Sequence, residues 1–185
     1  GIRVLDLGCG RGRILHRLAT LYPRSRFTGI DLSAEAIEHA RGNAQRDGLT
    51  NIEFVSADLS DYDQRAEDEA YDFITTFDAV HDQARPLNLL VGIRRALKPD
   101  GVYLMQDISG TSHVHKDCDH PIGTFLYTVS CMHCMTVSLA QGGEGLGAMW
   151  GEEKTREYLA RAGFGAVVTH RLAHDIQNNW YVVRK

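Results

Sequence analysis

The sequence predicts an α/β fold in which helices cover both faces of a doubly wound, mostly parallel sheet. Short apolar runs alternate with longer amphipathic segments along most of the chain, a pattern typical of repeated βαβ units. A glycine-rich turn follows the first apolar run, where such sheets bind nucleotides. The chain has 185 residues, 43% of them hydrophobic, enough for one core. We therefore expect a single domain over residues 1–185.

The elements follow in order from the start of the chain. Ser33 precedes a helical pattern as an N-cap, and Gly48 follows it as a stop. Pro86 suits a first helical turn, and residues 98–101 (KPDG) predict a stop and a tight turn. The expected strands are residues 3–7, 26–31, 52–57, 71–77 and 101–107, and the expected helices are residues 14–21, 34–46 and 86–97.

A long segment, residues 109–151, interrupts this pattern after the fifth strand. It is rich in His, Cys, Met and Gly and is too long for a plain connection, so we expect it to contribute function. Apolar residues at helical spacing predict a helix over 123–140 within it. A helix at 152–162 and strands at 166–171 and 180–184 then complete a seven-stranded sheet.

Composition disfavours several classes of protein. Twenty basic and 24 acidic residues give a net charge of −4, which argues against direct binding to nucleic acid. The four cysteines are scattered and no leader is visible, so we expect the reducing cytoplasm. Residues 121–143 lack charged side chains but carry many polar ones, which predicts a buried helix and no membrane contact.

The glycine-rich turn lies in the segment VLDLGCGRG, residues 4–12. Glycines remove side chains where a ligand must approach the backbone, at the start of a helix. A dinucleotide-binding oxidoreductase would need glycine at the sixth position counted from Gly8, where this chain has Arg13. The spacing is instead Asp-x-Gly-x-Gly-x-Gly.

That motif resembles the cofactor loop of class I S-adenosylmethionine-dependent methyltransferases, and the resemblance extends in order along nearly the whole chain. It implies S-adenosyl-L-methionine as cofactor and a Rossmann-like sheet with a reversed final strand. By this resemblance Asp31 holds the ribose hydroxyls and Asp58 accepts from the adenine amino group, although each aspartate also fits a simple turn cap. The implied cofactor-binding residues are Asp6, Gly8, Cys9, Gly10, Gly12, Asp31, Leu32, Asp58, Leu59 and Phe77.

Enzymes of this class place the methyl acceptor beside the end of the fourth strand. His81 follows that strand and has a side chain that titrates near neutrality, so it is a candidate general base. A helix-start histidine bonded to backbone is the alternative. Asp78 is a candidate to accept from the cofactor's amino group or to orient His81, and a solvated loop acid is its alternative.

The insertion carries further candidates. His113, His115, Cys118 and His120 have a spacing compatible with zinc, and Cys131 and Cys134 fall on one face of the expected helix. Buried free cysteines behave as small apolar residues, so we expect core or pocket lining and no metal site.

Residues 127–135 (YTVSCMHCM) resemble a narrower bacterial methyltransferase subgroup that carries a winged-helix domain upstream. This resemblance implies that residues 109–151 form a lid over the acceptor pocket. It also makes His133 and Tyr127 secondary candidates for acceptor contacts.

The leading hypothesis is methyl transfer from S-adenosylmethionine to a small-molecule acceptor. Two alternatives stay open: a cofactor-sensing module of a transcription regulator without turnover, and thiol-dependent methylation of a metalloid through Cys118, Cys131 and Cys134. Residue 1 lies just before a strand that the family buries. We therefore expect a preceding segment in the parent protein, tighter cofactor binding by that parent, and a possible homodimer through the preceding segment.

Overall fold

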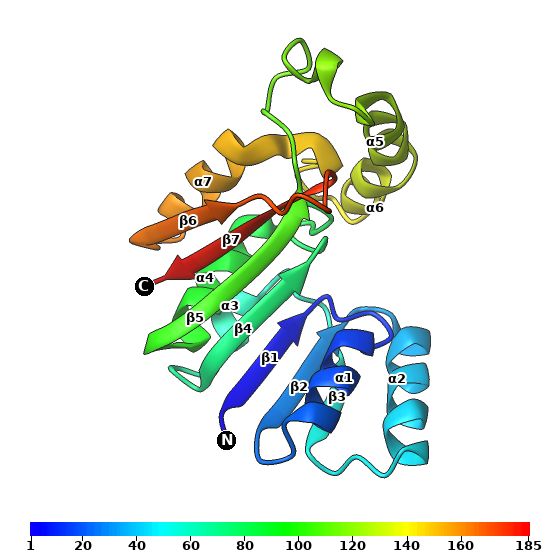
Figure 1. The fold of residues 1–185 in the computed structure, drawn as a ribbon, viewed down its shortest axis with the longest axis vertical. Helices are drawn as coiled ribbons and strands as arrows, with labels where there is room; N and C mark the ends of the chain where they lie inside the picture. Colours follow the sequence, from blue (N-terminus) through cyan, green and yellow to red (C-terminus); the bar gives the residue numbers. More distant parts are fainter.

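The computed structural model describes residues 1–185 and shows one seven-stranded sheet with helices on both faces (Figure 1). The strand order is β3-β2-β1-β4-β5-β7-β6, and β7 alone runs antiparallel to its neighbours. The prediction of a doubly wound, mostly parallel sheet is confirmed, and the final strand is reversed. The strands are β1 (Arg3–Leu7), β2 (Arg26–Asp31), β3 (Ile52–Ser56), β4 (Tyr71–Phe77), β5 (Leu97–Ile108), β6 (Ala166–His170) and β7 (Asn178–Arg184).

Helices α1 and α2 cover one face of the sheet, and α3, α4 and α7 cover the other (Figure 1). Alternate residues of β1 point to opposite faces. Val4 belongs to a cluster of eight buried residues under α1 and α2, whereas Leu5 and Leu7 belong to a cluster of 23 under the other helices. The helices are α1 (Arg13–Leu21), α2 (Ala34–Arg46), α3 (Tyr62–Arg65), α4 (Pro86–Ala96), α5 (Gly123–Val129), α6 (Met135–Ala140) and α7 (Gly151–Arg161).

The predicted boundaries of α2 and β4 match the structure. Ser33 caps α2, since its side chain accepts a hydrogen bond from the N–H of Ala36 at 3.2 Å. Gly48 follows α2 with a left-handed φ of 67°. These local signals act within a few residues, which is why the sequence alone locates them.

The segment around β4 and β5 differs from the expectation at one turn and contains one further short helix. The expected turn at residues 98–101 is an irregularity inside β5, because Tyr71 pairs with Leu97 and Phe73 with Val102. The acidic stretch before β4 contains the short helix α3, and Tyr62 within it is buried. Tyr62, Ala66 and Ala70 from this stretch pack in the core, while the acidic side chains between them are polar.

The segment between β5 and α7 projects beyond the carboxyl ends of the parallel strands (Figure 1). The helix expected over 123–140 is present as α5 and α6 joined by a π-helical turn, Ser130–Cys134. Short 3-10 turns cover Asp117–Asp119 and Ala148–Trp150. None of the helices has both the length and the apolar character needed to cross a membrane.

Candidate functional site

The glycine turn after β1 lies against the end of β2. The N–H groups of Gly8 and Cys9 both donate to the carbonyl of Ile30, at 2.8 and 3.1 Å. A Cβ on Gly8 would lie 2.5 Å from the Cβ of Ala79, so a side chain there is excluded. Gly10 has a φ of 53° and nothing within 4 Å of an added Cβ. The turn is therefore packed on one side and open at Gly10.

Asp31 ends β2 beside this turn. One carboxylate oxygen accepts from the N–H of Gly10 at 2.7 Å, and the other accepts from the N–H of Ser33 at 2.8 Å. A carboxylate offers about four acceptor positions, so each oxygen retains one for a ligand hydroxyl. The structure thus shows the turn-capping role considered from the sequence and leaves acceptor positions on the carboxylate unused.

Two cavities meet at Gly8. A cavity of about 130 Å³ lies on the β2 and β3 side, and one of about 390 Å³ lies on the β1 and β4 side. The first is lined by Gly8, Asp31, Leu32, Asp58, Leu59, Asp82, Gln83, Val137 and Gln141. The second is lined by Asp6, Gly8, Cys9, Gly10, Arg11, Arg13, Ile14 and Phe77.

Nine of the ten sequence-predicted cofactor residues line one of these two cavities; the exception is Gly12. A Cβ on Gly12 would lie 2.3 Å from the ring of Phe54, so this glycine allows α1 to pack against the sheet.

Another cavity, about 420 Å³, lies at the opposite end of the sheet, where β1 and β2 begin with Arg3 and Arg26. Doubly wound sheets bind ligands at the carboxyl ends of their strands, which favours the pair at Gly8.

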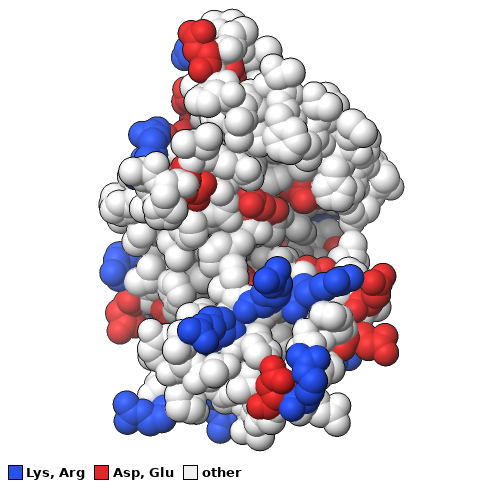
Figure 2. Space-filling model, turned by 45° about the vertical axis from the view of Figure 1, so that its right-hand side comes forward, with Lys and Arg blue, Asp and Glu red and all other residues white.

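Figure 2 shows a hollow across the middle of one face of the molecule. Basic side chains lie along its lower rim, and acidic side chains lie within and above it. Arg11 and Arg13 are exposed residues that line the larger cavity, together with the buried acid Asp6. This part of the site therefore presents both charges, as a zwitterionic amino-acid group requires.

Asp6 is only 3% exposed, and its carboxylate accepts a hydrogen bond from the hydroxyl of Thr75 at 2.8 Å. Burial raises the pKa of Asp6 to about 7; the nearby charge of Asp31 adds to this rise, and the Thr75 hydrogen bond opposes it. A cation placed in the adjoining cavity would favour the ionised form. Asp6 is thus a poised partner for an ammonium group.

Asp58 follows β3 at the mouth of the smaller cavity. Its carboxylate accepts from the N–H of Ser60 at 2.8 Å and from the Ser60 hydroxyl at 2.9 Å. This is the turn-capping arrangement considered as an alternative. Leu59 beside it is buried, whereas Leu32 on the β2 side is 55% exposed. The smaller cavity accordingly has an apolar side chain from each of two strand ends.

His81 is placed differently from the expectation of a general base facing the acceptor. It is 2% exposed, its Nδ1 lies 2.6 Å from a carboxylate oxygen of Asp107, and its Nε2 lies 3.1 Å from one of Asp82. Burial alone would lower the pKa of His81, but these carboxylates raise it well above its usual range. His81 is therefore enclosed by two acids, and its role as a general base stays a prediction. Its partners are carboxylates, so the backbone-bonded alternative is wrong.

Asp78 is hydrogen-bonded to Gln106 and makes no hydrogen bond to His81. Its carboxylate accepts from the Gln106 amide at 3.0 Å, and its N–H donates to the Gln106 carbonyl at 3.0 Å. Asp107 is the residue that orients His81, which corrects that part of the expectation. Asp78 has a left-handed φ of 48°, a strained conformation for this residue type that is often found at functional sites. Burial raises its pKa to about 6.

The remaining candidates of the insertion are spread apart. His133 is exposed, and the hydroxyl of Tyr127 donates to a carboxylate oxygen of Asp117 at 2.8 Å. Cys131 is exposed whereas Cys134 is buried, so the expectation of one shared face is wrong. A π turn holds more residues per turn than an α helix, which moves positions three apart onto different faces.

The structure assembles neither a zinc site from the histidine-rich spacing nor the three-thiol arrangement of the metalloid alternative. The side chains of His113, His115, Cys118 and His120 do not converge, and Cys118 and Cys131 lie outside any group of three potential ligands. One such group does exist, made of His81, Asp82 and Cys134. The metalloid hypothesis, which needs the thiols together, gains no support from this geometry.

Asp107 is the main site residue that the sequence reading missed. It is fully buried, and its carboxylate accepts from His81, from the N–H of Ile108 at 2.8 Å and from the indole of Trp150 at 3.3 Å. A signal was available, since Asp107 is an acid at the end of a strongly apolar strand next to β4. The carboxyl ends of neighbouring parallel strands meet at one edge of the sheet.

Comparison with known proteins agrees with this geometry. The family model described as a methyltransferase domain matches residues 1–163. A ubiquinone biosynthesis O-methyltransferase from Actinobacillus pleuropneumoniae is 32% identical over 114 residues, which cover 60% of this chain and 47% of that enzyme. The matched part of the chain therefore spans about half the length of this relative.

Solved structures share the fold at low sequence identity. A SAM-dependent methyltransferase from Aquifex aeolicus gives a TM-score of 0.71 at 18% identity, over 98% of this chain and 81% of that one. An O-methyltransferase family protein from Burkholderia thailandensis gives 0.76 at 18% identity, over 99% and 50% of the two chains. With the family match over most of its length, the chain belongs to the class I S-adenosylmethionine-dependent methyltransferases.

Proposed function

We propose that this chain binds S-adenosylmethionine along the two cavities that meet at Gly8 and transfers its methyl group to a small-molecule acceptor. The observation that carries the proposal is the meeting of a cavity lined by strand-end aspartates and leucines with one that holds a buried acid beside exposed arginines. An adenosine and a zwitterionic amino acid need these two environments, joined by a turn without side chains.

The adenosine half is assigned to the smaller cavity. Asp31 retains free acceptor positions for the two ribose hydroxyls, and Asp58 accepts from the adenine amino group. Leu32 and Leu59 supply apolar contacts to the two faces of the base. The exposed side chain of Leu32 supports this assignment, since a bound base would cover it.

The methionine half is assigned to the larger cavity. Asp6 pairs with the ammonium group, and Arg13 at the first turn of α1 pairs with the carboxylate. The N–H groups of a helix start also favour a carboxylate. Phe77, at the end of β4, lines this cavity next to the position of the sulfonium.

Methyl transfer from a sulfonium requires alignment more than activation, because the donor is already strongly electrophilic. Holding nucleophile, methyl carbon and sulfur in line contributes up to about 7–11 kcal/mol. Asp78 is the candidate to accept a proton from the acceptor or a hydrogen bond from the cofactor's ammonium. With a pKa of about 6 it is ionised at neutral pH and still basic enough to take a proton.

The insertion between β5 and α7 is proposed as a lid. Val137 and Gln141, on and just after α6, line the smaller cavity, so the end of α6 already covers the assigned adenosine position. Exposed His133, on the π turn before α6, is kept as a candidate for an acceptor contact. The acceptor group is proposed to be a hydroxyl, by extension from the O-methyltransferase that is 32% identical.

We also propose a cytoplasmic location and no direct contact with nucleic acid. The four cysteines are free, and the net charge is −4. Free thiols suit a reducing compartment, and a negative net charge opposes binding to phosphate backbones.

The test is calorimetric titration of the chain with S-adenosylhomocysteine, followed by hydrogen exchange. We expect binding at one site and slower exchange at residues 6–12, 31–33 and 58–60. Adenosine diphosphate, which has the same nucleoside without the amino acid, serves as the matched ligand control. Absence of binding, or protection confined to residues outside the two cavities, would overturn the proposal.

A further inference from the structure

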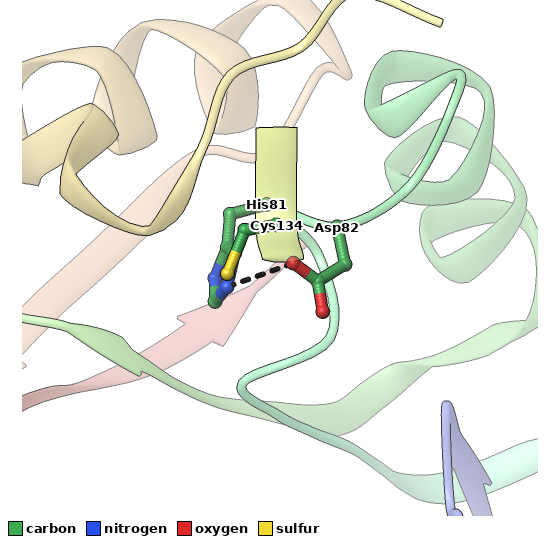
Figure 3. A group of neighbouring side chains, drawn as sticks. All are labelled: His81, Asp82 and Cys134. Atoms are coloured by element: carbon green, nitrogen blue, oxygen red, sulfur yellow. Dashed lines mark ion pairs between the residues drawn. The ribbon is translucent and has the colours of Figure 1, made fainter. Parts of the chain in front are cut away.

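The cluster formed by His81, Asp82 and Cys134 has no role in the function proposed above. One potential ligand atom from each residue lies within 4.8 Å of the others, and Figure 3 shows the three side chains pointing toward one another. The first two residues come from the loop after β4, and Cys134 comes from the π turn of the insertion. We propose that this cluster is a zinc site with three protein ligands and one open coordination position.

The first argument is the way His81 is held. Its Nδ1 lies 2.6 Å from a carboxylate oxygen of Asp107, which is itself fixed by the N–H of Ile108 and the indole of Trp150. Zinc-binding histidines usually donate one ring N–H to such a buried carboxylate, which leaves the other nitrogen for the metal. His81 Nε2 is that other nitrogen, and it faces Asp82 and Cys134.

The second argument is the spacing between His81 and Asp82. The Nε2 and Oδ1 atoms are 3.1 Å apart, yet Asp82 Oδ1 is buried and has no hydrogen-bond donor in acceptable geometry. Zinc bonds of about 2.0–2.2 Å at tetrahedral angles separate such ligand atoms by roughly 3.3–3.6 Å. The two atoms, 3.1 Å apart, are therefore close to the spacing that a shared metal imposes, and a metal would give the buried oxygen of Asp82 a partner.

The third argument is the backbone that presents Cys134. This residue ends the π turn Ser130–Cys134, and π turns inside α-helices are rare and frequently mark functional sites. The turn buries Cys134 to 5% exposure while Cys131 stays on the surface. A thiolate, an imidazole and a carboxylate together form a ligand set that suits zinc.

The open position has a chemical consequence, which rests on the proposed function. Asp82 also lines the smaller cavity beside Gly8, so the cluster adjoins the space proposed for the cofactor. An acceptor hydroxyl bound there through oxygen would lose its proton to solvent at a lowered pKa. Its oxygen lone pair then forms the bond to the methyl carbon, and the C–S bond breaks with its electrons moving to sulfur.

The experiment is titration of the metal-free chain with Zn²⁺ alone and with Co²⁺ as a spectroscopic probe. We expect one tightly bound ion per chain, tetrahedral cobalt bands and a sulfur-to-cobalt charge-transfer band. Cys134→Ser should remove the charge-transfer band, and Cys134→Ser and Asp82→Asn should each weaken affinity about 100-fold or more, beyond the 10–100-fold typical of a lost outer partner. Cys131→Ser, three residues away and exposed, is the matched control and should change neither.

The exposed histidines of the insertion offer a competing site. A double variant, His113→Gln with His115→Gln, should leave the affinity and the cobalt spectrum unchanged. Loss of metal binding in this variant, retention in Cys134→Ser, or absence of stoichiometric binding would each overturn the zinc site. Thermal melting of every variant separates loss of the metal from loss of the fold.

Failure of the zinc site is distinguishable from failure of the cofactor assignment. Calorimetry with S-adenosylhomocysteine on the metal-free chain tests the cofactor cavities by themselves. Cofactor binding without metal binding would contradict only the proposal of a zinc site. Metal binding without cofactor binding would contradict only the proposed function.

Discussion

The N–H of Gly10 donates to the carboxylate of Asp31 at 2.7 Å across 21 residues of sequence. This bond joins the open side of the glycine turn to the end of the neighbouring strand before any ligand arrives. The same carboxylate is held from its other side by the N–H of Ser33 at 2.8 Å. The group assigned to the ribose is therefore already oriented, so binding spends little free energy on ordering it.

Replacing Asp31 should weaken cofactor binding far more than it weakens the fold. Asp31→Ala removes charge-assisted hydrogen bonds to two ribose hydroxyls, each contributing about 1.5–3 kcal/mol, so we expect affinity for S-adenosylhomocysteine to fall about 100-fold or more. Calorimetry measures this. Asp47→Asn, at the far end of α2, is the control and should bind normally. Unchanged affinity in Asp31→Ala would remove Asp31 from the site.

Gly10 provides a sharper test, because a methyl group there meets no protein atom within 4 Å. Gly10→Ala should cost about 1–2 kcal/mol of stability from its left-handed φ, and should nearly abolish cofactor binding by filling ligand space. Gly48→Ala is matched, since Gly48 has a φ of 67° and also an empty surrounding, but it lies outside both cavities. Chemical unfolding of both variants measures the cost of backbone strain, and calorimetry measures whether the added methyl group blocks the cofactor. Equal binding by the two variants would contradict the site.

The fold was predictable because its signals are local. Alternating apolar runs located the strands, Ser33 located the start of α2, and the glycine spacing located the cofactor turn. The positions of Asp31 and Asp58 follow from the same signals, since Asp31 ends β2 and Asp58 lies two residues after β3, at one edge of the sheet. Parallel topology alone brings such residues together.

The acceptor half was not predictable in the same way. His81 titrates near neutrality in isolation, but its environment is set by Asp107 and Cys134, which come from β5 and the insertion. No spacing rule links those segments, because their proximity depends on the packing of the insertion. The π turn that separates Cys131 from Cys134 has no distinct sequence signal either, and an α-helical wheel places them together.

Cofactor affinity should depend on pH through Asp6. Burial raises the pKa of Asp6 from its usual 3.8 to about 7, and an ammonium group pairs only with the ionised form. Affinity should therefore fall as pH decreases from about 7.5 to 5, by up to tenfold per unit below the pKa, with proton release on binding. Asp6→Asn should bind more weakly at neutral pH and lose this dependence. If the affinity of Asp6→Asn still falls with decreasing pH, another titrating group causes the pH dependence.

The raised pKa of Asp6 affects the stability of the chain without cofactor in the opposite direction: its contribution to the unfolding free energy decreases as pH rises. The folded state retains a proton on Asp6 that the unfolded state has already lost, so this contribution to stability is complete below pH 3.8 and is lost as pH rises to about 7. Unfolding titrations of the parent chain and Asp6→Asn across this window should converge at low pH and separate toward neutrality. Parallel curves would show that Asp6 has the same pKa in the folded and unfolded chain.

Tyr127 distinguishes a structural from a substrate-binding role in the insertion. Its hydroxyl donates to Asp117 at 2.8 Å, and the other oxygen of this buried carboxylate accepts from the N–H and hydroxyl of Thr111 at 3.0 and 2.9 Å. Tyr127→Phe leaves a buried acceptor unpaired, which costs about 1–3 kcal/mol. We therefore expect lower unfolding free energy and faster hydrogen exchange at Thr111, with cofactor affinity unchanged.

The control for Tyr127→Phe is Tyr22→Phe, because Tyr22 is 57% exposed and its hydroxyl has no protein partner. That variant should match the parent chain in every measurement. If Tyr127→Phe instead retains full stability and normal exchange but raises the KM for an acceptor, the hydroxyl contacts substrate and the Asp117 bond is dispensable. If the Tyr127 hydroxyl instead links α5 to Thr111 through Asp117, its removal speeds hydrogen exchange in residues 111–123, and this result does not depend on the identity of the acceptor.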